Sequence, residues 1–150
     1  MWLDAILAYL HFTAIFLLFS FLTVEVILIR GPLDERVVRL LGRMDILYFG
    51  SAIAALVTGF LRAAFGAKGG DFYFNSWPIY VKIGLFLSIA AISIKPTMTF
   101  IRWKSAYERD PAWKVPAQEQ AAMRKLVFVE VHLAALIPVF AVIMSRGLGH

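Results

Sequence analysis

The sequence contains no cysteine, and this absence removes several kinds of site at once. Disulfides, thiolate-bound metals and iron–sulfur clusters all need the cysteine sulfur. Covalent attachment of a c-type haem needs it as well, so any haem in this protein is held noncovalently. The zinc-binding helix motif and a nucleophile–base pair are also missing, which leaves hydrolase chemistry without support.

Charged residues are scarce, at 17% of the chain, whereas 61% of its 150 residues are hydrophobic. Four apolar stretches are long enough to cross a hydrocarbon core of about 30 Å. They run from Leu3 to Ile29, from Met44 to Phe65, from Pro78 to Ile101 and from Leu126 to Met144. The first is too long for a signal peptide and follows no basic segment, so we expect it to be retained. The sequence predicts one all-α transmembrane domain over residues 1–150, a four-helix bundle in contact with membrane lipid.

The basic residues are concentrated at two of the three connections between these stretches. They are Arg30, Arg36, Arg39 and Arg43 at the first connection, and Lys95, Arg102, Lys104, Arg109, Lys114, Arg124 and Lys125 at the third. The positive-inside rule places both connections in the cytoplasm. We therefore expect a multi-pass protein of the bacterial inner membrane with both termini in the periplasm. Orientation explains the net charge of +5, and a nucleic-acid partner is not expected.

Two ionisable residues, His11 and Lys82, interrupt apolar stretches at a similar depth. At 1.5 Å per residue, His11 lies about 12 Å from the outer end of its helix and Lys82 about 6 Å from the outer end of its own. Both are expected to face a common pocket. His11 either binds haem iron or donates a hydrogen bond to a neighbouring helix. Lys82 either coordinates iron when neutral, pairs with a haem propionate, transfers a proton, or extends to the interface.

Three carboxylates, Glu25, Asp45 and Glu130, lie nearer the cytoplasmic ends of their helices. They either pass protons or form ion pairs with Arg43, Arg102 and Arg124, and for Asp45 we favour the ion pair with Arg43. Glu130 is expected to face into the bundle. His132, two residues further, is then turned by about 200° and faces a groove, a second subunit or a bent region near Pro138.

Small residues at four-residue spacing, Ser51, Ala55 and Gly59, predict a face of the second helix that another helix approaches closely. The third connection, from about Trp103 to Met123, is polar and contains two prolines. We interpret it as a tether, with a surface-lying segment or a docking site for a cytosolic partner as alternatives.

Short motifs in all four predicted helices follow an order that is shared with a known family. They are Leu10-His11-Phe12, Arg43-Met44, Trp77 with Val81-Lys82, and Val129-Glu130-Val131. In this order the chain resembles the membrane-bound HemJ-type protoporphyrinogen oxidase. From Leu7 to Gly149 it resembles more closely an uncharacterised bacterial family of small four-helix membrane proteins, in the motifs Gly66-Ala67-Lys68-Gly69, Phe72-Tyr73, Pro96-Thr97 and Ala135-Leu136-Ile137-Pro138.

The resemblance to the oxidase implies a first-helix histidine that binds b-type haem and an essential third-helix lysine, which correspond to His11 and Lys82. It implies an oxidoreductase activity, with a porphyrinogen or a quinol as the small-molecule redox partner. The oxidase carries Ser-Trp and Pro-Arg later in its first helix, whereas the segment from Phe16 to Ile29 here contains Glu25 instead. The substrate is therefore left open.

The leading hypothesis is a protein that holds noncovalent haem b through His11, the metal ligand. Lys82 is its second cofactor-binding residue, with His132 as the alternative second ligand. Lys82, Glu130 and Glu25 are the expected catalytic residues. The alternative is a non-enzymatic membrane subunit or assembly factor of a larger complex, and a homodimer is compatible with both.

Overall fold

The computed structural model describes residues 2–66 and 69–148. Over these residues the chain forms α1 (Trp2–Leu28), α2 (Glu35–Phe65), the short α3 (Gly69–Phe74), α4 (Trp77–Arg109) and α5 (Ala117–Ser145), and no strand. All except α3 are long and apolar enough to cross a membrane. The prediction of an all-α, four-helix membrane protein is thus confirmed.

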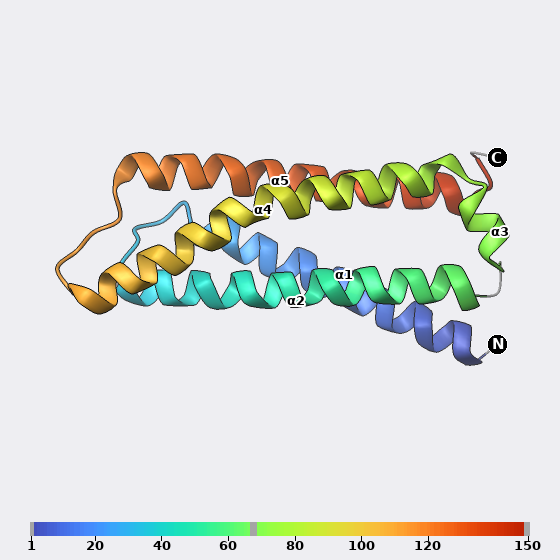
Figure 1. Ribbon diagram of the computed structural model, residues 1–150, viewed down its shortest axis with the longest axis horizontal. Coiled ribbons are helices and arrows are strands. Elements are labelled where there is room, and N and C mark those ends of the chain that lie inside the picture. The colour runs from blue at the N-terminus through green and yellow to red at the C-terminus, as the bar shows by residue number, and fades with distance from the viewer. Residues whose placement is uncertain (1, 67–68, 149–150) are drawn as a thin grey trace.

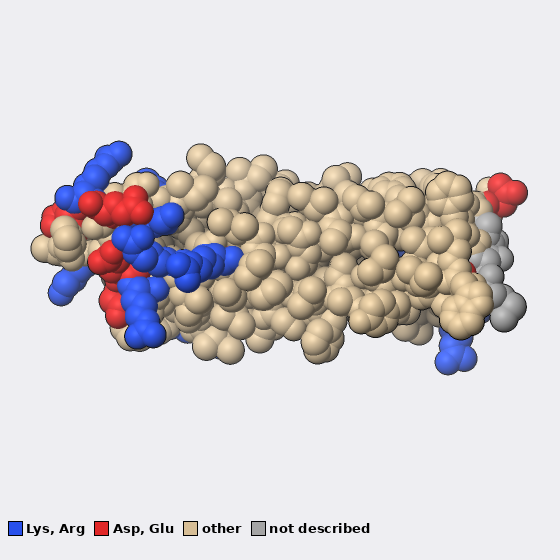
Figure 2. Space-filling model, turned by 90° about the horizontal axis from the view of Figure 1, so that it is seen from below, with Lys and Arg blue, Asp and Glu red and all other residues tan. Residues whose placement is uncertain are grey.

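The four long helices run antiparallel to their neighbours in the chain, so the two ends of the bundle differ in content (Figure 1). One end, the terminal end, carries α3 and the two chain termini. The other, the basic end, carries the connections 29–34 and 110–116. Charged side chains gather at the basic end, and the middle of the face in Figure 2 is almost free of them.

The helices associate mainly as two pairs, α1 with α2 and α4 with α5. The small-residue face of α2 lies in the first pair, since Ser51 and Ala55 are buried and Gly59 contacts α1. This prediction is therefore confirmed. Between the pairs α2 contacts α4, and α1 contacts α5, across a core that contains Leu22, Tyr48 and Ile89.

Three of the four helices extend beyond the predicted spans at the basic end. α2 begins at Glu35 instead of Met44, α4 continues to Arg109, and α5 begins at Ala117. A helix of 33 residues, such as α4, is about 50 Å long, whereas the hydrocarbon core is about 30 Å thick. The ends of these helices must therefore project into the interface and the aqueous phase.

The prediction of a loop from Trp103 to Met123 is wrong, because only residues 110–116 separate α4 from α5. Packing explains the extra turns: Phe100 and Trp103 are fully buried, and the Tyr107 hydroxyl donates to the Leu33 carbonyl at 2.9 Å. The Gln120 amide donates to the carbonyls of Ile29 and Gly31 at 3.0 and 2.8 Å. The basic end is a packed helical cap that holds the first connection in place.

Candidate functional site

The predicted site residues fall into two clusters at different depths. We call the first the histidine site; it contains His11 of α1, Thr58, Gly59 and Arg62 of α2, and Lys82 of α4. The second is the carboxylate site; it contains Glu25 of α1, Asp45 and Tyr48 of α2, Ser93 and Thr97 of α4, and Glu130 of α5. Fourteen residues separate His11 from Glu25, which is about 21 Å along α1.

A hydrogen bond to α2 orients the imidazole of His11. Its Nδ1 lies 3.0 Å from Thr58 Oγ1, which in turn donates to the Ala54 carbonyl at 2.6 Å. A hydroxyl has one hydrogen to give, so Thr58 accepts from Nδ1–H of His11. This assigns the tautomer with the lone pair on Nε2. The alternative role considered for His11, a hydrogen bond to a neighbouring helix, is thus observed, and it leaves Nε2 with a lone pair for a ligand.

Gly59 is the residue that lets the imidazole pack on the α2 backbone. A Cβ added at Gly59 would lie 3.1 Å from His11 Cε1 and 3.9 Å from Nε2. The first distance is closer than carbon atoms normally approach, so any larger residue displaces the ring. The small-residue face of α2 therefore also shapes the surroundings of the histidine.

Two cations accompany His11. Arg62, on α2, and Lys82, half-buried on α4, both interact electrostatically with the imidazole, Arg62 more strongly than Lys82. That His11 and Lys82 face a common pocket stays a prediction. The Arg62 guanidinium lies 5.3 Å from the centre of the Phe12 ring, and Arg62 Nε is buried without a hydrogen-bond partner among the described residues. The residues that define the histidine site thus include two basic side chains and no acidic one.

Sequence reasoning missed Thr58 and Arg62 as members of this site, because Arg62 was counted with the second connection. The four-residue spacing of Thr58 and Arg62 could have identified them, because residues four apart share a face of a helix. Thr58 and Arg62 form one row on α2, and this row adjoins the row of Ala55 and Gly59.

His132 does not belong to the histidine site. It is exposed on α5, where its Nδ1 lies 2.7 Å from the Phe128 carbonyl and its ring packs on the Phe128 ring. Glu130, two residues away, faces inward as predicted and is level with Glu25. The structure therefore does not bring His132 to His11 within one protomer.

The carboxylate site is buried where the two helix pairs meet. Glu25 and Glu130 are each 1% exposed, and Asp45 is 4% exposed. Thr97 Oγ1 donates to Asp45 Oδ1 at 3.0 Å, and Ser93 Oγ lies 3.0 Å from Glu130 Oε2. The Tyr48 hydroxyl lies 3.4 Å from Ser93 Oγ, so hydroxyl groups from α2 and α4 bridge the pairs.

The ion pairs predicted for these carboxylates are not formed in the described part of the chain. Arg102 pairs with Glu119 at 2.6 Å, and Arg43 and Arg124 are exposed. The favoured pairing of Asp45 with Arg43 is therefore wrong. Arg43 and Asp45 lie at nearly the same depth along α2, which was the basis of the prediction. Two residues turn a side chain by about 200°, however, so Arg43 faces outward and Asp45 faces inward.

Neither cluster is a preassembled metal centre of the usual kind. Among residues 2–66 and 69–148, no group of three or more histidine, cysteine, aspartate or glutamate side chains is arranged to hold a metal ion. The three carboxyl groups interact electrostatically without converging on one point. The carboxylate site is thus distinct in chemistry from a divalent-metal site.

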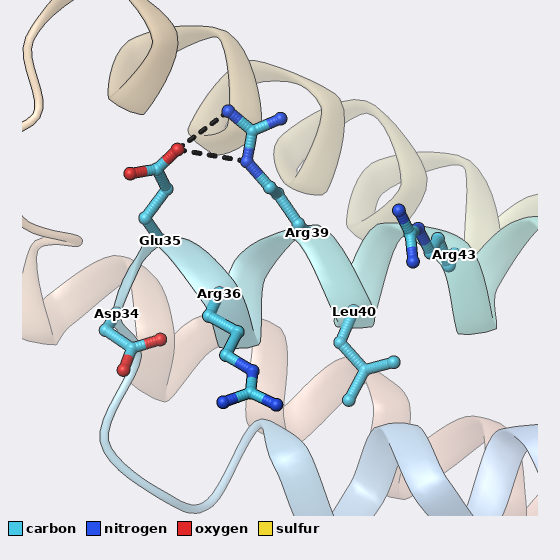
Figure 3. Close-up of a pocket in the computed structure, with 6 residues that line it drawn as sticks. All are labelled: Asp34, Glu35, Arg36, Arg39, Leu40 and Arg43. Carbon is cyan, nitrogen blue, oxygen red and sulfur yellow. Dashed lines mark hydrogen bonds and ion pairs between the residues drawn. The ribbon is translucent and has the colours of Figure 1, made fainter.

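Two surface pockets are lined by residues that belong to neither cluster. The first involves the opening turns of α2, where Glu35 accepts from Arg39 at 2.7 Å and Arg36 points the other way (Figure 3). The second lies between α4 and α5, and it is lined by Lys95, Thr99, Arg102, Gln118, Glu119, Ala122 and Met123. Their charged linings suit the membrane–water interface.

Comparison with known proteins gives the family and no activity. No curated protein and no solved structure matches this sequence. A sequence model of the family described as "Predicted membrane protein (DUF2214)" matches residues 3–149, which is nearly the whole chain. The chain belongs to this family of membrane proteins.

Proposed function

We propose that this membrane protein binds one noncovalent b-type haem per protomer through Nε2 of His11 and has a redox role. The observation that carries the proposal is the hydrogen bond from His11 Nδ1 to Thr58, which is itself anchored to the Ala54 carbonyl. A histidine that ligates a metal usually donates its other ring N–H to a fixed acceptor, which sets the tautomer and the ring orientation. His11 has this arrangement.

The surroundings of His11 fit a haem in chemistry. The positive charges of Arg62 and Lys82 complement the two propionates of the cofactor. The exposed ring of Phe12, whose centre lies 6.2 Å from that of the His11 ring, is an apolar neighbour that suits an apolar macrocycle. A bound haem supplies a one-electron couple whose potential depends on its axial ligands and surroundings.

Lys82 has three proposed roles at this site. Its amine would bind the haem iron in the neutral form or hold a propionate when charged. In the neutral form it would also take a proton from a substrate. The proposed substrate class is a porphyrinogen or a quinol, because both release protons together with electrons.

An absorption spectrum of the purified protein tests the proposal. Protein made in haem-replete cells is expected to show a Soret band that His11→Ala abolishes. The matched control is His132→Ala, which removes an exposed histidine and should leave the band intact. Thr58→Val removes the acceptor of Nδ1–H and is expected to shift the spectrum without abolishing it.

A colourless wild-type protein from haem-replete cells would contradict the proposal. Copurification of that colourless protein with other membrane proteins would instead support the alternative, a cofactor-free subunit or assembly factor. Homodimerisation is compatible with either role, because much of each helix surface is apolar and exposed.

We further propose that the protein lies in the bacterial inner membrane with the basic end in the cytoplasm and both termini in the periplasm. The concentration of lysine and arginine beside the connections 29–34 and 110–116 supports this orientation. The histidine site would then lie in the periplasmic half of the membrane.

A further inference from the structure

The carboxylate site brings three acidic side chains together without a basic partner. Glu25 interacts electrostatically with both Asp45 and Glu130. The groups that face them are the hydroxyls of Tyr48 on α2 and of Ser93 and Thr97 on α4. Within the described ranges, no lysine, arginine or histidine forms an ion pair with any of the three. Three buried negative charges without a positive partner would destabilise the folded protein too strongly for all three carboxyl groups to stay ionised.

Two carboxyl oxygens in this site are unpaired. Glu25 Oε1 and Glu130 Oε1 are buried without a hydrogen-bond partner in the described part of the chain, and both residues are 1% exposed. A buried oxygen of an ionised carboxylate needs a hydrogen-bond donor. A neutral carboxylic acid tolerates such surroundings far better, since it carries no charge to be solvated.

The hydroxyl of Ser93 gives Glu130 only part of a hydrogen bond. Ser93 Oγ donates to the Ile89 carbonyl at 2.8 Å and to Glu130 Oε2 at 3.0 Å, and it lies 3.4 Å from the Tyr48 hydroxyl. A hydroxyl has one hydrogen, so the two acceptors share it. With Oε1 unpaired and Oε2 served by a shared donor, the surroundings of Glu130 favour the neutral acid. Asp45 differs, because Thr97 donates to it and neither of its oxygens is buried without a partner among the described residues.

Buried apolar side chains flank the site along the bundle axis. About one turn away they are Leu22, Ile89 and Ala134 on the terminal side, and Ile29, Leu41, Phe100 and Val127 on the basic side. The hydroxyl residues Ser51 of α2 and Thr99 of α4 are buried beside these layers. On α1, Ala14, Leu18 and Leu22 fill the face between His11 and Glu25.

We infer that Glu25, Asp45 and Glu130 form an occluded proton-binding site that holds two protons at neutral pH. One proton resides on Glu130 and one on Glu25, while Asp45 keeps its charge and accepts from Thr97. The site is independent of haem. Since the site is buried between largely apolar layers, its protons exchange slowly with water.

Infrared spectroscopy of the full-length protein tests this assignment. A maltoside detergent is suitable because it has no carbonyl group of its own. At neutral pH the wild type is expected to show the carbonyl stretch of protonated carboxylic acids, and the band should shift slowly after transfer to heavy water. Glu25→Gln and Glu130→Gln should each remove half of the band, whereas the exposed control Glu108→Gln should leave it unchanged.

The wild-type spectrum alone decides the main point, even if a variant fails to fold. A spectrum without a protonated carboxyl band at neutral pH would overturn the inference. A band that survives both Glu25→Gln and Glu130→Gln would also overturn it. So would stabilisation of the wild type by sodium or potassium ions that Glu25→Gln abolishes, because the ligand would then be a metal cation.

Discussion

At the scale of single residues, orientation within a helix matters more than depth in the membrane. The prediction that Glu130 faces inward and His132 outward is confirmed, because a difference of two residues fixes the angle between side chains. The same geometry makes the pairing of Asp45 with Arg43 wrong. Arg62 was not predicted to belong to the histidine site, because it lies near the end of a helix and was counted with the charged residues of the adjoining connection.

Gly59 offers a stability test at this scale. Gly59→Leu places a side chain where a Cβ alone would lie 3.1 Å from His11 Cε1, so the imidazole must be displaced and the contact between α1 and α2 repacked. Overpacking of this kind typically costs about 1–3 kcal/mol. We expect a lower midpoint of thermal unfolding in detergent. Gly50→Leu on the same helix is the matched control, since nothing lies within 4 Å of its added Cβ, and an equal loss in both variants would contradict this account.

At the scale of helices, hydropathy located the spans but not their ends. The apolar stretches predicted all four long helices, because burial in lipid selects for apolar residues along their whole length. The extensions at the basic end are polar on one face and packed on the other. Their stability depends on contacts such as that of Tyr107 with Leu33, which no local pattern reveals. The short α3 was missed for the same reason.

Limited proteolysis distinguishes a helical cap from a flexible tether at this end. Trypsin cleaves after lysine and arginine, and Lys114 lies in the exposed connection 110–116, whereas Lys104 and Lys125 lie within helices. Because a protease needs a locally unfolded segment, the first cut is expected after Lys114. Lys114→Gln should slow this cleavage markedly. Early cuts after Lys104 or Lys125, seen by mass spectrometry, would indicate the predicted tether instead.

At the scale of the whole molecule, the two ends of the bundle have different chemistry. His11 lies in the first half of α1 and Arg62 lies near the end of α2, so the histidine site lies towards the terminal end. The packed basic cap lies at the other end (Figure 1). The carboxylate site lies between them at the contact of the helix pairs. Sequence alone indicated the two depths, but which polar groups meet there depended on how the pairs pack.

The orientation of the bundle in the membrane can be tested with single cysteines, because the chain has none of its own. Arg146→Cys marks the terminal end, and Lys114→Cys marks the basic end. If lysine and arginine hold the basic end in the cytoplasm, a thiol reagent that does not cross the inner membrane should label only Arg146→Cys in intact cells. Both variants should be labelled once the membrane is permeabilised. The wild type, which has no cysteine, should not be labelled in either condition. Labelling of Lys114→Cys alone in intact cells would reverse the proposed orientation and move the histidine site to the cytoplasmic half.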